Sequence, residues 1–220
     1  MQEARPGFWV PDRTSWIWLF KGGGESLPGI DRIEACVAAC GDRLGVAIDG
    51  GAFVGSWTIR LAASFQRVVA FEPITENFEC LERNVTCLPG VVDKVDLCRC
   101  ALSNRVGPMG RKRPDLKAYS QRVRHLSRKV DTAWCEFNGV TLDSTEVKDV
   151  DLIKLDVEGH EYEALLGAQG TINEFKPVVM IEEKHDPDRR ATALLEKWGM
   201  VCTWSKSYDF LFTWPGQDTE

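Results

Sequence analysis

The chain has 220 residues, 44% of them hydrophobic, and a formal net charge of −6, which allows one sizeable core and excludes a disordered chain. No linker rich in Pro, Gly or Ser divides it, so we predict a single domain over residues 1–220. The N-terminus lacks a signal-peptide pattern and no apolar run is long enough to cross a bilayer. We therefore expect a cytoplasmic protein with no membrane partner.

Strand and helix patterns alternate along the chain, which favours an α/β fold with a mainly parallel sheet and helices on both faces. The predicted strands cover residues 44–49, 67–72, 95–101, 151–156 and 177–183. The predicted helices cover residues 30–41, 56–65, 75–86, 160–169 and 188–198, several of them with a polar residue at the start. Two apolar runs at 200–204 and 208–214 flank a polar turn and predict a closing antiparallel hairpin.

The first 43 residues are predicted to form an aromatic and helical cover. Residues 8–20 are unusually rich in aromatic side chains, and Trp16 and Trp18 alternate with apolar residues as in a strand. We expect this segment to pack on the sheet or on the pocket of a substrate, with stacking on a sugar or base as the alternative.

A glycine-rich loop follows the strand at 44–49. The strand ends at Asp49 and continues into Gly50, Gly51 and Gly55, and the next strand ends at Glu72-Pro73. Glycines let the backbone approach a ligand, and an acid after the second strand can accept hydrogen bonds from ribose hydroxyls. No G-x-G-x-x-G spacing is present, which argues against NAD. At this point an ordinary strand-to-helix corner remains an alternative.

Residues 150–168 carry a longer motif, with Lys154-x-Asp156-x-Glu158-Gly159-His160-Glu161 at the end of a strand and a helix after it. This run closely resembles the signature of FkbM-type methyltransferases. The resemblance extends over about residues 44–183 and includes, in the family's order, Phe71-Glu72-Pro73, Ala101-Leu102-Ser103 and Thr141-Leu142-Asp143. The first motif, Asp49-x-Gly51-x-x-x-Gly55, resembles that of class I S-adenosylmethionine-dependent methyltransferases.

The resemblance implies a Rossmann-like class I methyltransferase fold and S-adenosylmethionine as the cofactor. Ligands of open α/β sheets bind at the carboxyl ends of the strands. The implied cofactor contacts, from the methionine end through the ribose and adenine to the sulfonium, are Asp49, Gly50, Gly51, Phe53, Gly55, Glu72, Pro73, Ala101, Leu102 and Asp156. The chain departs from the family pattern at Gly50 and Phe53, where Val and Asn are usual, so an aromatic contact replaces a polar one.

Catalysis of methyl transfer to oxygen needs a positioned acceptor and a base for its proton. The predicted catalytic residues are Asp156, Glu158 and His160, and Asp156 is preferred because it should lie beside the sulfonium. Further candidate bases are Glu161, Glu182, Glu183 and His185.

Three of these candidates also have a structural alternative. Glu158 could orient its loop, Glu161 could cap the following helix, and His160 could be a hydrogen-bonded structural residue. Lys154 is expected to pair with a carboxylate. We predict no metal site, although Asp156 together with a glutamate after the fifth strand could bind magnesium.

The acceptor is suggested by a basic segment at residues 105–130. This segment has nine Lys or Arg residues and one Asp, a charge of about +8, within an insertion at 105–135 that is expected to form a lid over the site. A basic lid suits a small anionic acceptor or a nucleic acid. A solvated loop that balances an acidic body is the alternative.

The sequence therefore predicts O-methylation of a small polar, sugar-like or anionic acceptor. One alternative is an RNA ribose 2′-O-methyltransferase with a Lys-Asp-Lys-Glu tetrad. Asp156, Lys184 and Lys21 could supply three of its members, but the expected glutamate is missing from the final hairpin. The other alternative is an adaptor that binds the cofactor without catalysis. The oligomeric state is left open.

Overall fold

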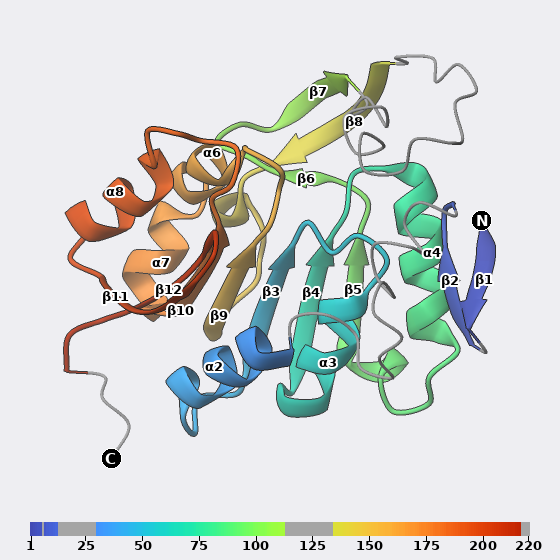
Figure 1. The fold of residues 1–220 in the computed structure, drawn as a ribbon, viewed down its shortest axis with the longest axis horizontal. Coiled ribbons are helices and arrows are strands. Elements are labelled where there is room, and N and C mark those ends of the chain that lie inside the picture. The colour runs from blue at the N-terminus through green and yellow to red at the C-terminus, as the bar shows by residue number, and fades with distance from the viewer. Residues whose placement is uncertain (6, 13–29, 113–133, 217–220) are drawn as a thin grey trace.

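A seven-stranded sheet forms the centre of the computed structural model (Figure 1), which describes residues 1–5, 7–12, 30–112 and 134–216. The strand order is β11-β12-β10-β9-β3-β4-β5. The five strands from β10 to β5 are parallel, and β11 and β12 close the sheet as an antiparallel hairpin. The strand bounds are β3 Val46–Gly50, β4 Arg67–Phe71, β5 Val95–Cys98, β9 Val150–Leu155, β10 Val178–Glu182, β11 Val201–Lys206 and β12 Asp209–Thr213.

The predicted α/β architecture with a terminal hairpin is thus confirmed. Strand β3 is buried along its whole length and β9 and β10 almost so, which explains the continuous apolar runs of the central parallel strands. The chain runs outward from β3 through β4 to β5 and then returns to β9 on the other side of β3. Strand order therefore reverses between β3 and β9, where open α/β sheets bind their ligands.

Helices cover both faces of the sheet. Helices α2, α3 and α4 pack on one face, for example through Leu61 and Leu81, and α6, α7 and α8 pack on the other through Leu165, Ile172 and Leu195. The helix bounds are α2 Ile30–Cys40, α3 Ser56–Ser64, α4 Thr75–Thr86, α6 Glu161–Leu166, α7 Gln169–Phe175 and α8 Arg190–Lys197, with 3-10 turns η1 Val92–Lys94 and η2 Leu142–Ser144.

Two local predictions were wrong in detail. The helix predicted at 160–169 is divided into α6 and α7 at Gly167, where a Cβ would lie 1.9 Å from the Ser103 carbonyl oxygen. The strand predicted at 95–101 ends at Cys98, because Ala101 and Leu102 pair with a different sheet. Helices α3 and α4 begin at the polar residues Ser56 and Thr75, as predicted, and neither has a side-chain cap at its N-terminus.

A second sheet of three strands follows β5. It consists of β6 Ala101–Leu102, β7 Gly107–Lys112 and β8 Trp134–Val140, with β7 and β8 antiparallel. These strands contain both ends of the insertion predicted at 105–135, whereas residues 113–133, with most of its basic side chains, lie outside the described residues.

The N-terminal cover is represented by a hairpin and by α2. Strands β1 Gln2–Arg5 and β2 Phe8–Val10 are antiparallel and lie beside α4 (Figure 1). The strand suggested around Trp16 and Trp18 lies outside the described residues, as does Lys21. Within the described ranges, no helix combines the length and the apolar character that crossing a bilayer requires.

Candidate cofactor and active site

The carboxyl ends of β3, β4 and β9 meet at one edge of the sheet and bring the two main sequence motifs together. The Asp156 N–H donates to the Gly50 carbonyl at 3.0 Å, which joins the end of β9 to the start of the glycine loop. The Gly51 and Ala52 N–H groups donate to the Phe71 carbonyl at 2.9 and 3.0 Å. The loop is therefore anchored to both neighbouring strands.

The glycines of this loop are required by close approach and by backbone conformation. Gly51 has a φ of +76°, and a Cβ at this position would lie 1.9 Å from the Asp156 carbonyl oxygen. Gly55 has a φ of +90°, and its Cβ would lie 2.8 Å from a methyl group of Leu81. Any larger residue at Gly51 would separate the glycine loop from β9.

Asp49 lies beneath the loop and has no exposed surface. Its Oδ1 is 2.9 Å from Lys154 Nζ, and its Oδ2 accepts a hydrogen bond from Thr58 Oγ1 at 2.7 Å. Burial alone would lower the pKa of Lys154, but Asp49 and Asp156 raise it above its ordinary value, so the lysine is charged. The expected pairing of Lys154 with a carboxylate is confirmed, and Asp49 contacts the loop through this lysine. A contact between Asp49 and the cofactor stays a prediction.

Glu72 follows β4 and is 5% exposed. Its Oε2 accepts from the Phe53 N–H at 3.0 Å, and its Oε1 accepts from the Ile74 N–H at 2.9 Å and from Asn77 Nδ2 at 3.2 Å. Burial raises the pKa of Glu72 to about 7, although these hydrogen bonds favour the ionised form. The carboxyl group is thus oriented by the loop and titrates near neutral pH.

The other predicted cofactor contacts lie around this edge. Phe53 has a φ of +54°, and its side chain packs with Trp9 in a cluster around the N-terminal hairpin. Leu102 is buried, and its Cδ1 would lie 3.1 Å from a Cβ at Gly50. Strand β6, which contains Ala101 and Leu102, therefore reaches the glycine loop, as the predicted adenine corner requires.

Asp156 directly follows β9, Glu182 ends the neighbouring strand β10, and the two carboxyl groups are hydrogen-bonded to each other. Burial raises the pKa of Glu182 to about 8. The negative charges of Asp156 and of Asp209, which pairs with Glu182 from β12, raise this pKa further. Burial also raises the pKa of Asp209 to about 6, although Arg32 Nε lies 2.8 Å away. Glu182 is therefore largely protonated at neutral pH and can donate to Asp156.

Glu182 was only a secondary candidate in the sequence. In the sequence, Glu182 is recognisable only as an acid at the end of a predicted strand. Its proximity to Asp156 follows only from the position of β10 beside β9. Glu183 has a different role: it is buried, and its carboxylate accepts from the Ala191 N–H at 2.7 Å and from Thr192 Oγ1 at 2.5 Å. Glu183 therefore stabilises the start of α8.

The loop between β9 and α6 is held by Glu161. This residue is 2% exposed, and its Oε1 accepts from the Val157 and Gly159 N–H groups at 3.0 and 3.1 Å. These two bonds hold the loop that precedes α6, which is a different role from the helix cap suggested as the structural alternative for Glu161. Glu158 has a φ of +57°, and its carboxylate lies 2.9 Å from His185 Nε2, which joins this loop to the loop after β10.

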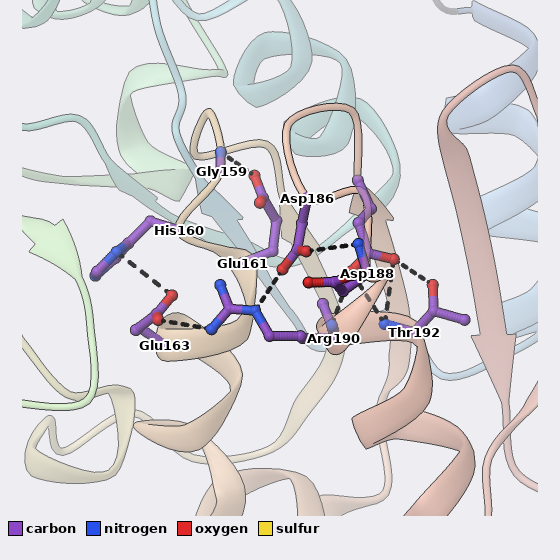
Figure 2. Close-up of polar contacts among 10 residues, drawn as sticks. Gly159, His160, Glu161, Glu163, Asp186, Asp188, Arg190 and Thr192 are labelled. Carbon is purple, nitrogen blue, oxygen red and sulfur yellow. Dashed lines mark hydrogen bonds and ion pairs between the residues drawn. The ribbon is translucent and has the colours of Figure 1, made fainter.

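His160 is hydrogen-bonded at the start of α6 (Figure 2). Its Nε2 lies 3.0 Å from Ser103 Oγ, and its Nδ1 lies 3.6 Å from Glu163. Glu163 in turn contacts Arg190, which donates to Asp186 at 2.7 Å. These contacts connect β6, α6 and the loop before α8, and they agree with the structural alternative for His160.

The described side chains include no group of three His, Cys, Asp or Glu residues that could hold a metal ion. Magnesium binding by Asp156 with a glutamate after β10 therefore receives no support from this part of the chain. The carboxylate oxygens of Glu183 accept hydrogen bonds from the start of α8 and are therefore turned towards that helix.

A family profile matches most of the chain, including the loops described above. The profile of the methyltransferase FkbM domain matches residues 49–212, from the end of β3 to β12. The chain belongs to the FkbM methyltransferase family. Among curated proteins, no sequence matches it.

Solved structures agree on the fold. An FkbM methyltransferase from Methylobacillus flagellatus KT is 20% identical, with a TM-score of 0.52, over 78% of this chain and 44% of its own. The chain thus spans less than half the length of that relative. A precorrin-6y C5,15-methyltransferase from Geobacter metallireducens GS-15 is 15% identical, with a TM-score of 0.52, over 86% of this chain and 90% of its own. The predicted class I methyltransferase fold is confirmed.

Proposed function

We propose that this FkbM-family chain uses S-adenosylmethionine to methylate an oxygen of a small polar, sugar-like or anionic acceptor. The family supports methyl transfer as the reaction class. The observation that carries the proposal is the arrangement of Glu72 and the Asp156–Glu182 pair around one glycine loop, at the edge where strand order reverses.

The residues at this edge fit the proposed cofactor. Glu72 presents an oriented carboxyl group after the second parallel strand, where ribose hydroxyls can donate to it. Gly51 brings the loop backbone against β9, next to the half-buried Asp156. A carboxylate at this place attracts a sulfonium by charge. When bound, S-adenosylmethionine would supply the electrophilic methyl group.

A group that can take the proton of the acceptor hydroxyl lies at the same edge of the sheet. An acceptor hydroxyl that takes a methyl group loses one proton, and Asp156 is a partly exposed carboxylate at this edge. Glu182, whose pKa is raised to about 8, donates a hydrogen bond to Asp156 and holds this carboxylate in place. Glu158 and His160 are engaged with His185 and Ser103 and are the secondary candidates.

The choice of an anionic acceptor rests on the insertion. Ser103, directly after β6, contacts His160 in the loop that follows β9, so the second sheet borders the proposed site. The basic segment at 105–130 is continuous with this sheet in sequence and carries a charge of about +8. The same charge would suit an RNA ribose, and RNA is therefore included in the test.

The proposal is tested by calorimetric titration of the purified protein with S-adenosylmethionine, S-adenosylhomocysteine and NAD. We expect micromolar binding of the first two, no binding of NAD, and much weaker binding in Glu72→Gln. Glu79→Gln, an exposed change on α4, is the matched control and should bind normally.

Binding would be followed by a transfer assay with radiolabelled methyl donor. Sugar phosphates and nucleotide sugars should be labelled in an alkali-stable linkage, as an ether requires. Labelling of RNA alone would favour the ribose 2′-O-methyltransferase. Cofactor binding without transfer to any acceptor would favour the adaptor, and no cofactor binding would overturn the proposal.

A further inference from the structure

Asn84 on α4 joins the N-terminal hairpin to the glycine loop. Its side chain is completely buried. Asn84 Oδ1 accepts from the Trp9 N–H at 2.6 Å, and its Nδ2 donates to the Trp9 carbonyl at 2.9 Å and to the Val54 carbonyl at 2.7 Å. One amide group therefore holds both backbone polar groups of a residue in β2 and one carbonyl of the loop.

The same stretch of the loop contacts Glu72. Phe53, which precedes Val54, donates its N–H to Glu72 Oε2 at 3.0 Å. Its φ of +54° is unusual for a residue other than glycine and needs surrounding contacts to maintain it. A continuous series of contacts thus leads from Trp9 through Asn84 and the loop to the Glu72 carboxylate.

Apolar packing supports the same connection. Val10 and Val54 are completely buried in one cluster, and Trp9 and Phe53 pack against it. The Arg83 guanidinium lies 3.5 Å from the centre of the Trp9 ring, which adds a cation–π contact between α4 and β2. Figure 1 shows β1 and β2 beside α4, away from the central strands, so α4 and the loop are the surfaces on which the hairpin docks.

We propose that docking of the β1–β2 hairpin sets the glycine loop in its cofactor-binding conformation, with Asn84 as a positioning residue. The inference rests on the proposed function, because it concerns affinity for the same cofactor. The hairpin acts through the Phe53 N–H, which orients the Glu72 carboxyl group. When the hairpin is undocked, Phe53 can adopt other backbone conformations. Part of the binding free energy of the cofactor is then used to order the loop, and the affinity falls.

The test uses three full-length variants and S-adenosylhomocysteine as the probe. Asn84→Asp keeps the side-chain volume but loses the donors to the Trp9 and Val54 carbonyls. Val10→Asp undocks the hairpin, and Val10→Ala is the milder form should the aspartate variant not fold. We expect Asn84→Asp and Val10→Asp to weaken binding by about tenfold or more, and Val10→Ala by less. Val201→Asp, on the exposed face of β11, is the matched control and should bind as the wild type does.

Two further readouts separate positioning from general destabilisation. Amide hydrogen exchange at Phe53, measured without cofactor, should be faster in Asn84→Asp and Val10→Ala than in Val201→Asp. In a Glu72→Gln background, the same substitutions should weaken binding much less than in the wild type, because they act through that carboxylate.

The outcomes are distinguishable. If the wild type does not bind S-adenosylhomocysteine, the proposed function fails. If it binds and the folded hairpin variants bind within about twofold of it, the inference alone fails. Equal losses with and without Glu72 would also overturn it, since the hairpin would then act on stability only.

Discussion

Lys154 Nζ lies 2.9 Å from Asp49 Oδ1, and both side chains are buried between the neighbouring strands β9 and β3. The same ammonium donates to the carbonyls of Gly50 and Gly51 at 3.3 and 3.0 Å. This pair therefore joins the two motifs of the chain at the place where the strand order reverses. Its role is to hold the glycine loop against β9, which makes it a structural element of the proposed site.

Asp49→Ala should strongly destabilise the fold. The change leaves the Lys154 ammonium buried without its carboxylate, and loss of one member of a buried pair costs about 3–5 kcal/mol. Urea denaturation measures the free energy of unfolding. The matched control is Asp96→Ala, which removes an exposed ion pair with Arg67 and should cost less than about 1 kcal/mol. Equal losses in the two variants would contradict the structural role of Asp49.

Gly51→Ala should disrupt the loop because of steric overlap with β9. The added Cβ would lie 1.9 Å from the Asp156 carbonyl oxygen. Gly90→Ala is the control, because Gly90 also has a positive φ but no atom within 4 Å of a Cβ. Thermal unfolding should show a cost of about 1–2 kcal/mol for Gly90→Ala and a clearly larger one for Gly51→Ala. Similar costs would indicate that left-handed strain alone makes Gly51 necessary.

Cofactor affinity should depend on pH through Glu72. Its pKa is raised to about 7, so the carboxyl group becomes ionised, and a better acceptor for ribose hydroxyls, as the pH rises through that value. We expect S-adenosylhomocysteine to bind more tightly at about pH 8 than at about pH 6. Calorimetry on Glu72→Gln should show weaker binding with most of this dependence removed. A pH dependence that persists unchanged in the variant would assign it to another group.

Stability should fall with rising pH because of Glu182. Its pKa in the folded protein is about 8, well above its ordinary value of 4.5, so the folded state keeps a proton that the unfolded state loses between these values. The folded state is therefore progressively less favoured as the pH rises through this range. Glu182→Gln should remove this contribution, so that the variant gains stability relative to the wild type towards pH 8.

The same variant also tests catalysis. Glutamine can still donate to Asp156 but cannot take part in proton exchange, so turnover should fall while cofactor affinity changes little. Glu174→Gln, an exposed change on α7, serves as the control for both measurements. Unchanged turnover in Glu182→Gln would exclude Glu182 from the reaction.

Much of the sheet could be predicted because its central strands are buried on both faces. Such strands appear in the sequence as continuous apolar runs, and in each motif an acid follows the run directly, as at Glu72 and Asp156. The errors occur where distant segments touch. Helix 160–169 is interrupted because the backbone at Gly167 approaches Ser103, and this contact has no local signal in the sequence.

The edge of the sheet at which the proposed site lies was predictable, whereas the contacts among its side chains were not. Glu182 and Asp209 become neighbours of Asp156 only through the order β9-β10-β12, and their raised pKa values depend on that burial. The link from Trp9 to the glycine loop through Asn84 joins residues 75 positions apart.

The sequence by itself determined the family, the alternation of strands and helices, and the residues at which the strands end, because these depend on local periodicity and on contiguous motifs. Only the tertiary structure decided that Asp49 pairs with Lys154, that Glu182 lies beside Asp156 with a raised pKa, and that the N-terminal hairpin contacts the glycine loop. The physical reason is that hydrogen-bond partners and pKa values follow from burial and from which strands lie side by side. Neither is encoded within a short stretch of chain.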